Sequence, residues 1–272
     1  MEKFDGITLG EWLARWYRVY KEPYLSESSL NNIKMVIRLH IPDDMKQTRL
    51  DEITPYMIED AIADVTAPRM RQYTWQVFHA AFDMAALHNI IERDPMRLVP
   101  KVKHKQKIGN SLSPLEIKEF KHKIRKHPLR DLFEFYLYTG CRRSEALTVT
   151  KYDIDTVSMT LRIRGTKSKT SDRVMPISKP LEYVINRVIT SADPYLFHVT
   201  GDYASRAFKA LCPNHKLHDL RHTFATHCLQ CGVSMKVLQL WLGHASFETT
   251  ASIYTHVVDA FQRTEASKIA WF

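Results

Sequence analysis

The sequence predicts a mostly α-helical fold in two domains, with a small antiparallel β-sheet in the second domain. Two observations lead to this prediction. Apolar residues recur at helical spacing over most of the chain and alternate with polar residues only between 156 and 177. A stretch rich in proline, lysine and glycine near 100–110 separates the two helical parts.

The first hundred residues predict a small helical domain, 1–100. Thr8 and Glu11 form a capping-box pattern before a helix with Leu9, Trp12, Leu13, Trp16, Tyr17 and Tyr20 on one side. A second helix is expected from about Ser28 to His40. A third opens at Thr54-Pro55, and a fourth runs from Pro68 to about Asn89, because proline suits the first position of a helix.

A basic linker, 101–110, follows this domain. Asp94-Pro95 and Val99-Pro100 interrupt the helical pattern, and lysines recur up to residue 107. Ser113-Pro114-Leu-Glu116 then combines a capping box with a proline at the first helical position. The second domain is therefore expected to span 111–272.

The second domain begins with helices that reach about Leu147. Met159, Leu161 and Ile163 then alternate with polar residues as in a strand, and a polar turn at 165–172 leads to a return strand at 173–177. Helices resume at Lys179. Gly232 is expected to end one of them, and Ser234 to cap the next, which leads to Trp241.

Composition and charge restrict the classes of function. The chain has 272 residues, 44% of them hydrophobic, and lacks an apolar run of about 18 residues or an apolar N-terminal signal, so neither a membrane span nor secretion is expected. Four cysteines suggest a reducing cytoplasm rather than a disulfide framework. Residues 101–130 hold 10 basic against 2 acidic residues, which is typical of a polyanion contact or of a solvated linker, whereas residues 1–100 hold 12 against 15.

Two arginines, a lysine, two histidines and a tyrosine in the second domain suit attack on a phosphodiester without a metal. A free tyrosine has a pKa of about 10, so it needs nearby cations to act as a nucleophile. Arginine forks bind phosphate oxygens bidentately and can stabilise the charge of a pentacoordinate phosphorane. Lysine or histidine can protonate the leaving oxygen, an effect of roughly 10²–10⁴-fold.

Three strings carry a resemblance to the tyrosine recombinases of the phage-integrase family. They are Thr139-Gly-Cys-Arg142-Arg-Ser-Glu145, the HxxR string from Leu217 to His227, and Leu242-Gly-His244 with Tyr254 ten residues later. The resemblance covers 111–258, and the helical first domain resembles the core-site-binding domain of such enzymes. It implies a two-domain clamp around double-stranded DNA, with a 3′-phosphotyrosyl intermediate and no cofactor or metal.

The resemblance also implies a role for each matching residue. Tyr254 is expected to be the nucleophile, with Arg142 and Arg221 on the non-bridging oxygens. His218 is expected to be a base or a phosphate donor, and His244 to hydrogen-bond the phosphate. Lys167 is expected to protonate the leaving oxygen, although Lys169 lies close enough to compete for this role. Glu145 is expected to hold an active-site arginine or histidine in place.

Further contacts with DNA are expected outside this set. They are Lys101, Lys103, Lys105 and Lys107 in the linker, Lys169 and Arg173 around the hairpin, and Arg69 and Arg71 at the start of the fourth helix. Cys228 and Cys231 form a CxxC pattern, but an apolar helix and the lack of a second pair favour buried thiols over zinc.

The expected assembly is a homotetramer on two sites, because strand exchange needs four tyrosines, and an accessory DNA-bending protein is a possible partner. The tail 257–272 is expected to pack on a neighbouring subunit or on its own domain. The first helix begins near residue 8, so a further arm-binding domain is not expected. Two other functions compete: DNA relaxation as in a type IB topoisomerase, and regulation by a DNA-binding protein that does not cleave.

Overall fold

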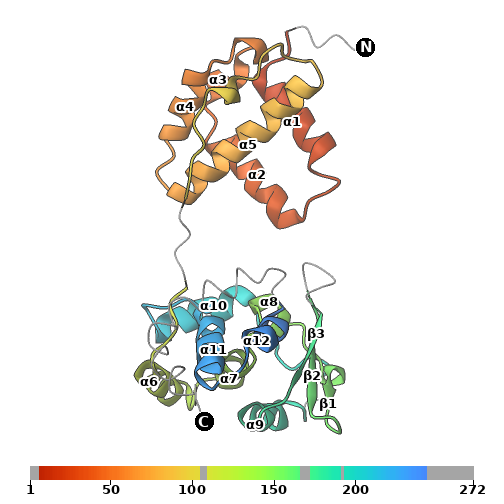
Figure 1. Cartoon of the computed structure of the whole chain (residues 1–272), viewed down its shortest axis with the longest axis vertical. Coiled ribbons are helices and arrows are strands. Elements are labelled where there is room, and N and C mark those ends of the chain that lie inside the picture. Colours follow the sequence, from red (N-terminus) through yellow and green to blue (C-terminus); the bar gives the residue numbers. More distant parts are fainter. Residues whose placement is uncertain (1–5, 105–108, 166–171, 191–192, 244–272) are drawn as a thin grey trace, which may run out of the picture. The chain divides into compact units, whose positions relative to one another are not determined.

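The computed structural model describes residues 6–104, 109–165, 172–190 and 193–243. The chain divides into two compact units, Met1–Gln106 and Lys107–Phe272 (Figure 1). The described parts are mostly helical with one small antiparallel sheet, which confirms the predicted fold class. None of the helices in these parts is both long and apolar enough to cross a membrane.

The first unit is entirely helical where it is described. Its elements are α1 Leu9–Tyr20, α2 Glu27–Leu39, α3 Asp43–Gln47, η1 Leu50–Glu52, α4 Pro55–Ala63, α5 Pro68–Leu87 and η2 Pro95–Arg97. The capping box expected at Thr8 is present, with both of its hydrogen bonds to Glu11. The short elements α3, η1 and η2 were not predicted, because each has too few residues to show a period.

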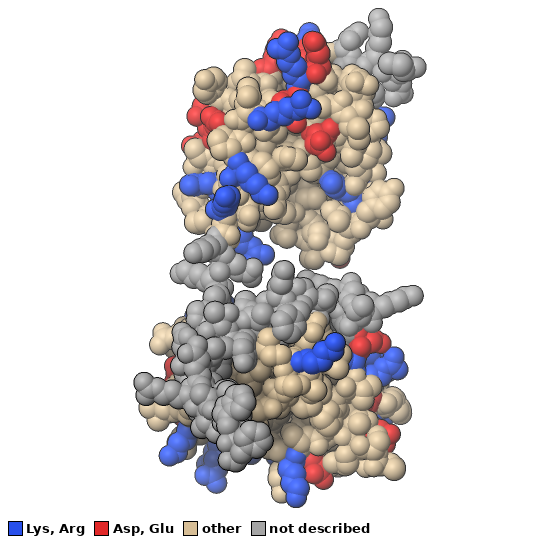
Figure 2. Space-filling view, in the orientation of Figure 1, with Lys and Arg blue, Asp and Glu red and all other residues tan. Residues whose placement is uncertain are grey.

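Helix α1 is fixed to α5 by two buried indole rings. Trp12 and Trp16 are at most 1% exposed, and their Nε1 groups donate to the carbonyls of Ala81 at 2.9 Å and Ala80 at 3.1 Å. Each tryptophan therefore buries a large apolar ring without leaving its N–H unpaired. On the face shown in Figure 2, both basic and acidic side chains of this unit reach the surface.

The second unit surrounds its three strands with helices. Its helical elements are α6 Pro114–Ile124, α7 Arg130–Thr139, α8 Arg143–Ala146, η3 Lys151–Asp153, α9 Lys179–Val188, α10 Gly201–Leu211, α11 Asp219–Gln230 and α12 Met235–Leu242. Helix α7 is almost fully buried and packs against both α9 and α11. The core thus lies around α7. Residues of α7 and α11 pack in this core, which fixes the C-terminal end of α7 and the N-terminal end of α11, where the sequence motifs lie.

The sheet has the order β1-β2-β3, with β1 Ile154–Asp155, β2 Thr160–Ile163 and β3 Arg173–Pro176, all antiparallel. The two-residue strand β1 was not predicted. Met159 was expected in the strand, but its φ of 51° places it in the preceding turn, so β2 begins one residue later. Ser234 caps α12 as predicted, with its side chain accepting from the N–H of Val237.

Candidate active site

The first part of the site is the turn that ends α7. Gly140 closes the helix with a φ of 61°, a left-handed conformation that favours glycine. A Cβ at this position would also lie 2.3 Å from Cδ1 of Phe224. The Thr139 hydroxyl donates to the Phe135 carbonyl at 2.7 Å and accepts from the N–H of Cys141 at 3.3 Å. The turn therefore delivers Arg142 to the start of α8 in one orientation.

Glu145 is the central acceptor of the site. Its side chain is fully buried and accepts from the backbone N–H and the Nη1 of Arg142, both at 2.7 Å, and from Nη2 of Arg173 at 2.8 Å. Burial alone would raise the pKa of Glu145, but the two arginines lower it to about 2. The carboxylate therefore stays ionised and holds Arg142.

Arg221 is the second buried guanidinium, and it lies in the first turn of α11. Its side chain donates from Nη1 to the Gly140 carbonyl at 2.8 Å and from Nη2 to the Leu242 carbonyl at 2.6 Å. Only 3% of the residue is exposed, and within the described ranges no carboxylate pairs with it. Burial and the nearby charges of Arg142 and Arg173 lower the pKa of Arg221 to about 9. Such a cation is stabilised when an anion binds beside it.

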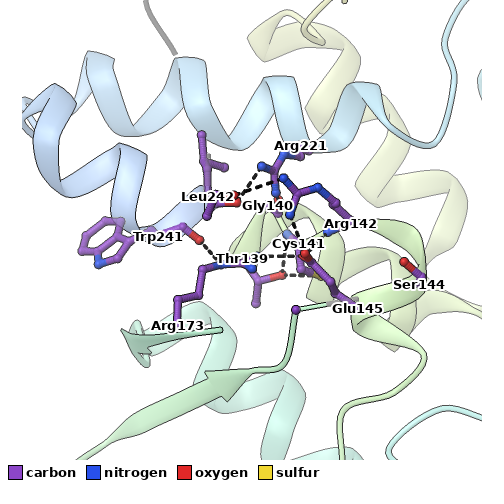
Figure 3. A network of polar contacts seen from close by, with 12 residues as sticks. Thr139, Gly140, Cys141, Arg142, Ser144, Glu145, Arg173, Arg221, Trp241 and Leu242 are labelled. Atoms are coloured by element: carbon purple, nitrogen blue, oxygen red, sulfur yellow. Dashed lines mark hydrogen bonds and ion pairs between the residues drawn. The ribbon is translucent and has the colours of Figure 1, made fainter. Parts of the chain in front are cut away.

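All three arginines meet at the last turn of α12. Arg173 donates from Nε to the carbonyl of Trp241, Arg221 to that of Leu242, and Arg142 to that of Gly243 at 3.1 Å (Figure 3). The carbonyls at a helix C-terminus lack intrahelical partners and carry the negative end of the helix dipole, so they attract cations. The site therefore fixes the point where α12 ends and the chain continues toward His244.

His218 lies at the N-terminal end of α11, one helical turn from Arg221. Although the residue has exposed surface, partial burial of its ring, together with His222 and Arg221, lowers the pKa of His218 to about 4. Its ring meets that of His222 edge-on, with centroids 5.0 Å apart. At neutral pH His218 is therefore unprotonated and able to accept a proton.

Arg143, the first residue of α8, turns away from this cluster. Its Nη1 donates to the Gly201 carbonyl at 3.2 Å, to Asp202 at 3.0 Å and to the Ser205 hydroxyl at 3.1 Å. These contacts attach α8 to α10. Arg143 is thus a packing residue beside the site.

The remaining predicted residues fall into two groups. Lys167, Lys169, His244, Tyr254, Lys105, Lys107 and the tail 257–272 lie outside the described residues. Lys101, Lys103 and Arg69 are exposed, whereas Arg71 donates to the carbonyls of Val65 at 2.9 Å and Ala63 at 3.4 Å and so caps the end of α4.

Arg173 differs from its prediction. It was expected on the DNA-contacting surface, but its side chain is only 5% exposed and is directed at Glu145 and Trp241. A signal for this was present in the sequence: Arg173 and Met175 are two residues apart in a strand, so they share one face, and that face is the buried one. The acceptors at the end of α12 are backbone carbonyls, which the residue types do not indicate, so only the structure reveals that the arginines bind there.

Comparison with known proteins gives matches over both units. Residues 111–260 match the phage integrase family, and residues 8–66 match the phage integrase N-terminal SAM-like domain. The chain is 33% identical over 204 residues to the tyrosine recombinase XerA of Pyrococcus furiosus, an alignment that covers 67% of this chain and 68% of that protein.

Two solved structures share the fold. One is a Tn1549 transposon integrase in complex with a circular intermediate DNA, with a TM-score of 0.76, 17% identity, and coverage of 97% of this chain and 100% of that one. The other is a lambda integrase tetramer bound to a Holliday junction, with a TM-score of 0.74, 19% identity, and coverage of 88% of this chain and 78% of that one. At these identities the likeness concerns the fold alone.

Proposed function

The chain belongs to the phage integrase family, and we propose that it is a site-specific DNA recombinase that cuts and rejoins DNA through a 3′-phosphotyrosyl intermediate. One observation carries this proposal. Arg142, Arg173 and Arg221 meet at the end of α12, and Glu145 is the carboxylate that pairs with the first two, so this described cluster of four side chains holds two positive charges in excess. A cluster of this charge suits a bound phosphodiester.

The two arginines nearest to an incoming phosphate are Arg142 and Arg221. The Arg142 side chain is 30% exposed and uses only Nη1 and Nη2 in the contacts given above, so its fork can share further N–H groups with a phosphate oxygen. Arg221 is held rigidly by two carbonyls. Donors positioned before the reaction stabilise the added charge of the transition state without reorganising.

The chemical step transfers the scissile phosphoryl group from the 5′ oxygen of DNA to the hydroxyl oxygen of Tyr254. The hydroxyl oxygen of Tyr254 attacks phosphorus, and its proton goes to His218. The bond from phosphorus to the 5′ oxygen breaks, and Lys167 supplies the proton that makes the free 5′-hydroxyl. Attack by a 5′-hydroxyl of another strand reverses these transfers, so the bond is conserved without ATP. His244 hydrogen-bonds the phosphate in this scheme.

Double-stranded DNA is the proposed partner, and the lysines of the linker neutralise part of its backbone charge. We infer that the active form is a homotetramer on two sites, since each exchange uses four strand cleavages. The lambda integrase tetramer bound to a Holliday junction offers a precedent for that assembly within the same fold. The number of phosphates neutralised is measurable, because affinity falls with salt in proportion to it.

The test is to trap the covalent complex. Duplexes selected by the protein from a random-sequence library are given a nick a few nucleotides 3′ of the cleavage position, so that the short fragment bearing the released 5′-hydroxyl diffuses away and cannot reverse the attack. The wild type is expected to form a denaturation-resistant protein–DNA adduct, and Tyr254→Phe to bind the same duplex without forming it. An adduct with Tyr254→Phe contradicts the choice of nucleophile, and its absence with the wild type on every selected duplex contradicts the function.

A further inference from the structure

Arg173 adds a buried charge to the arginine cluster, but the chemical step above assigns it no role of its own. Its side chain is only 5% exposed, and Arg173 faces inward with Met175 while Val174 and Pro176 face outward. Across the sheet it is paired with Ile163, which is fully buried. Its guanidinium donates hydrogen bonds to groups of the protein, so its charge acts on those groups.

Two contacts show which groups these are. Nη2 of Arg173 donates to Glu145 Oε2 at 2.8 Å, and Nε donates to the carbonyl of Trp241. One guanidinium thus joins β3, α8 and the last turn of α12. Glu145 in turn holds the side chain of Arg142, and the neighbouring carbonyl of α12 holds Arg221. Arg173 is thus connected to Arg142 through Glu145, and to Arg221 through adjacent carbonyls of α12.

The charge balance gives Arg173 a second effect. With Arg173 present, Glu145 is neutralised from the buried side, and Arg142 keeps most of its attraction for an external anion. Without Arg173, the buried carboxylate has only Arg142 as a charged partner among the described residues, so the two would form a closed pair. A guanidinium bound in such a pair stabilises a phosphate less.

We propose that Arg173 is a positioning residue that holds Glu145, and through it Arg142, together with the last turn of α12 in the arrangement used for cleavage. This inference rests on the proposed function. It predicts that Arg173 acts on the cleavage step and leaves DNA binding nearly unchanged, because its side chain is directed at Glu145 and at the end of α12. It also predicts that both halves of the guanidinium fork are needed, since each half contacts a different element.

The test compares Arg173→Met with Arg162→Met. Arg162 lies in the same hairpin, but its side chain is 57% exposed and pairs with exposed Asp172. Arg173→Met is expected to slow adduct formation on the nicked duplex by roughly 10²-fold, the cost of a small misplacement of reacting groups. Its dissociation constant for the same duplex is expected to stay within about threefold of the wild type. Arg162→Met is expected to change neither.

Two further measurements separate positioning from a general loss of structure. In Arg173→Ala, added guanidinium ion at constant ionic strength is expected to restore part of the cleavage rate, whereas sodium is not. If the methionine or alanine variant does not fold, Arg173→Lys takes its place, because an ammonium keeps the charge but lacks the planar fork. The lysine variant is expected to cleave slowly and to bind DNA as tightly as the wild type. Equal cleavage by the wild type and Arg173→Lys, or parallel losses of binding and cleavage, would overturn the proposal.

Hydrogen exchange of the DNA-free protein gives a readout that does not depend on catalysis. Arg173→Met, or Arg173→Lys in its place, is expected to increase exchange in the last turn of α12 and in α8, while Arg162→Met leaves both unchanged. If the wild type forms no adduct, the proposed function fails. The exchange data still test whether Arg173 stabilises α8 and the last turn of α12. Unchanged exchange at the end of α12 in the Arg173 variant would contradict the inference whatever the activity.

Discussion

Replacing Glu145 with glutamine should remove a pH-dependent part of the protein's stability. Glutamine has nearly the same shape, but it cannot carry the charge that Arg142 and Arg173 surround. The pKa of Glu145 is lowered from 4.5 to about 2 in the folded protein, so folding favours the ionised form. The stabilisation is therefore complete above the unfolded-state pKa and is lost as pH falls from about 5 to below 2.

The size of the effect follows from the shift. A difference of roughly 2.5 pKa units corresponds to about 3 kcal/mol of free energy of unfolding at neutral pH. Because the Glu145 side chain is fully buried, solvent screening reduces this value little. The glutamine variant should thus be less stable than the wild type at pH 7, and the difference should narrow as the pH falls toward 2.

Urea-induced unfolding, followed by circular dichroism between pH 2 and 7, measures this difference. Glu116→Gln is the matched control, because the pKa of Glu116 is also lowered to about 2, chiefly by hydrogen bonds from Ser113 and His215. Its side chain is 43% exposed, so its contribution should be much smaller. Parallel pH curves for the wild type and Glu145→Gln, or an equal effect of the two substitutions, would refute the reasoning.

Three other substitutions or titrations follow from the site. Arg221→Lys should slow adduct formation by roughly 10²–10³-fold, because the donors of an ammonium sit on one nitrogen and lack the planar fork that reaches the Gly140 and Leu242 carbonyls; a rate near that of the wild type would contradict this role. In the DNA-free protein, NMR titration of His218 should give a midpoint near pH 4, and a midpoint above 6 would show that the ring is more solvated. Gly140→Ala should cost more than about 2 kcal/mol in thermal denaturation, because its Cβ would overlap Phe224, whereas Gly232→Ala, in open space, should cost about 1 kcal/mol; equal losses would contradict the steric argument.

The helices were largely predictable because the signals that start and stop them are local. Thr8 and Ser113 form the predicted capping boxes, and Ser234 caps the helix that leads to Trp241. The two-residue strand β1 and the left-handed Met159 were missed, since elements of that length show no period. The pairing of Glu145 with Arg142 was also predictable, because the two residues are three apart at a helix start.

The residue sequence by itself determined the helical order, the change of period between 156 and 177, and the family of the chain, because these depend on neighbouring residues and on motif strings. Only the tertiary structure shows which groups the inward-facing Arg173 contacts and that three arginines meet the end of α12. Arg173 is 28 positions from Glu145, and Arg142 is 101 positions from Gly243. Such contacts depend on how β3, α8, α11 and α12 pack together. Every residue has a backbone carbonyl, so the residue type does not indicate which carbonyl accepts a hydrogen bond from an arginine.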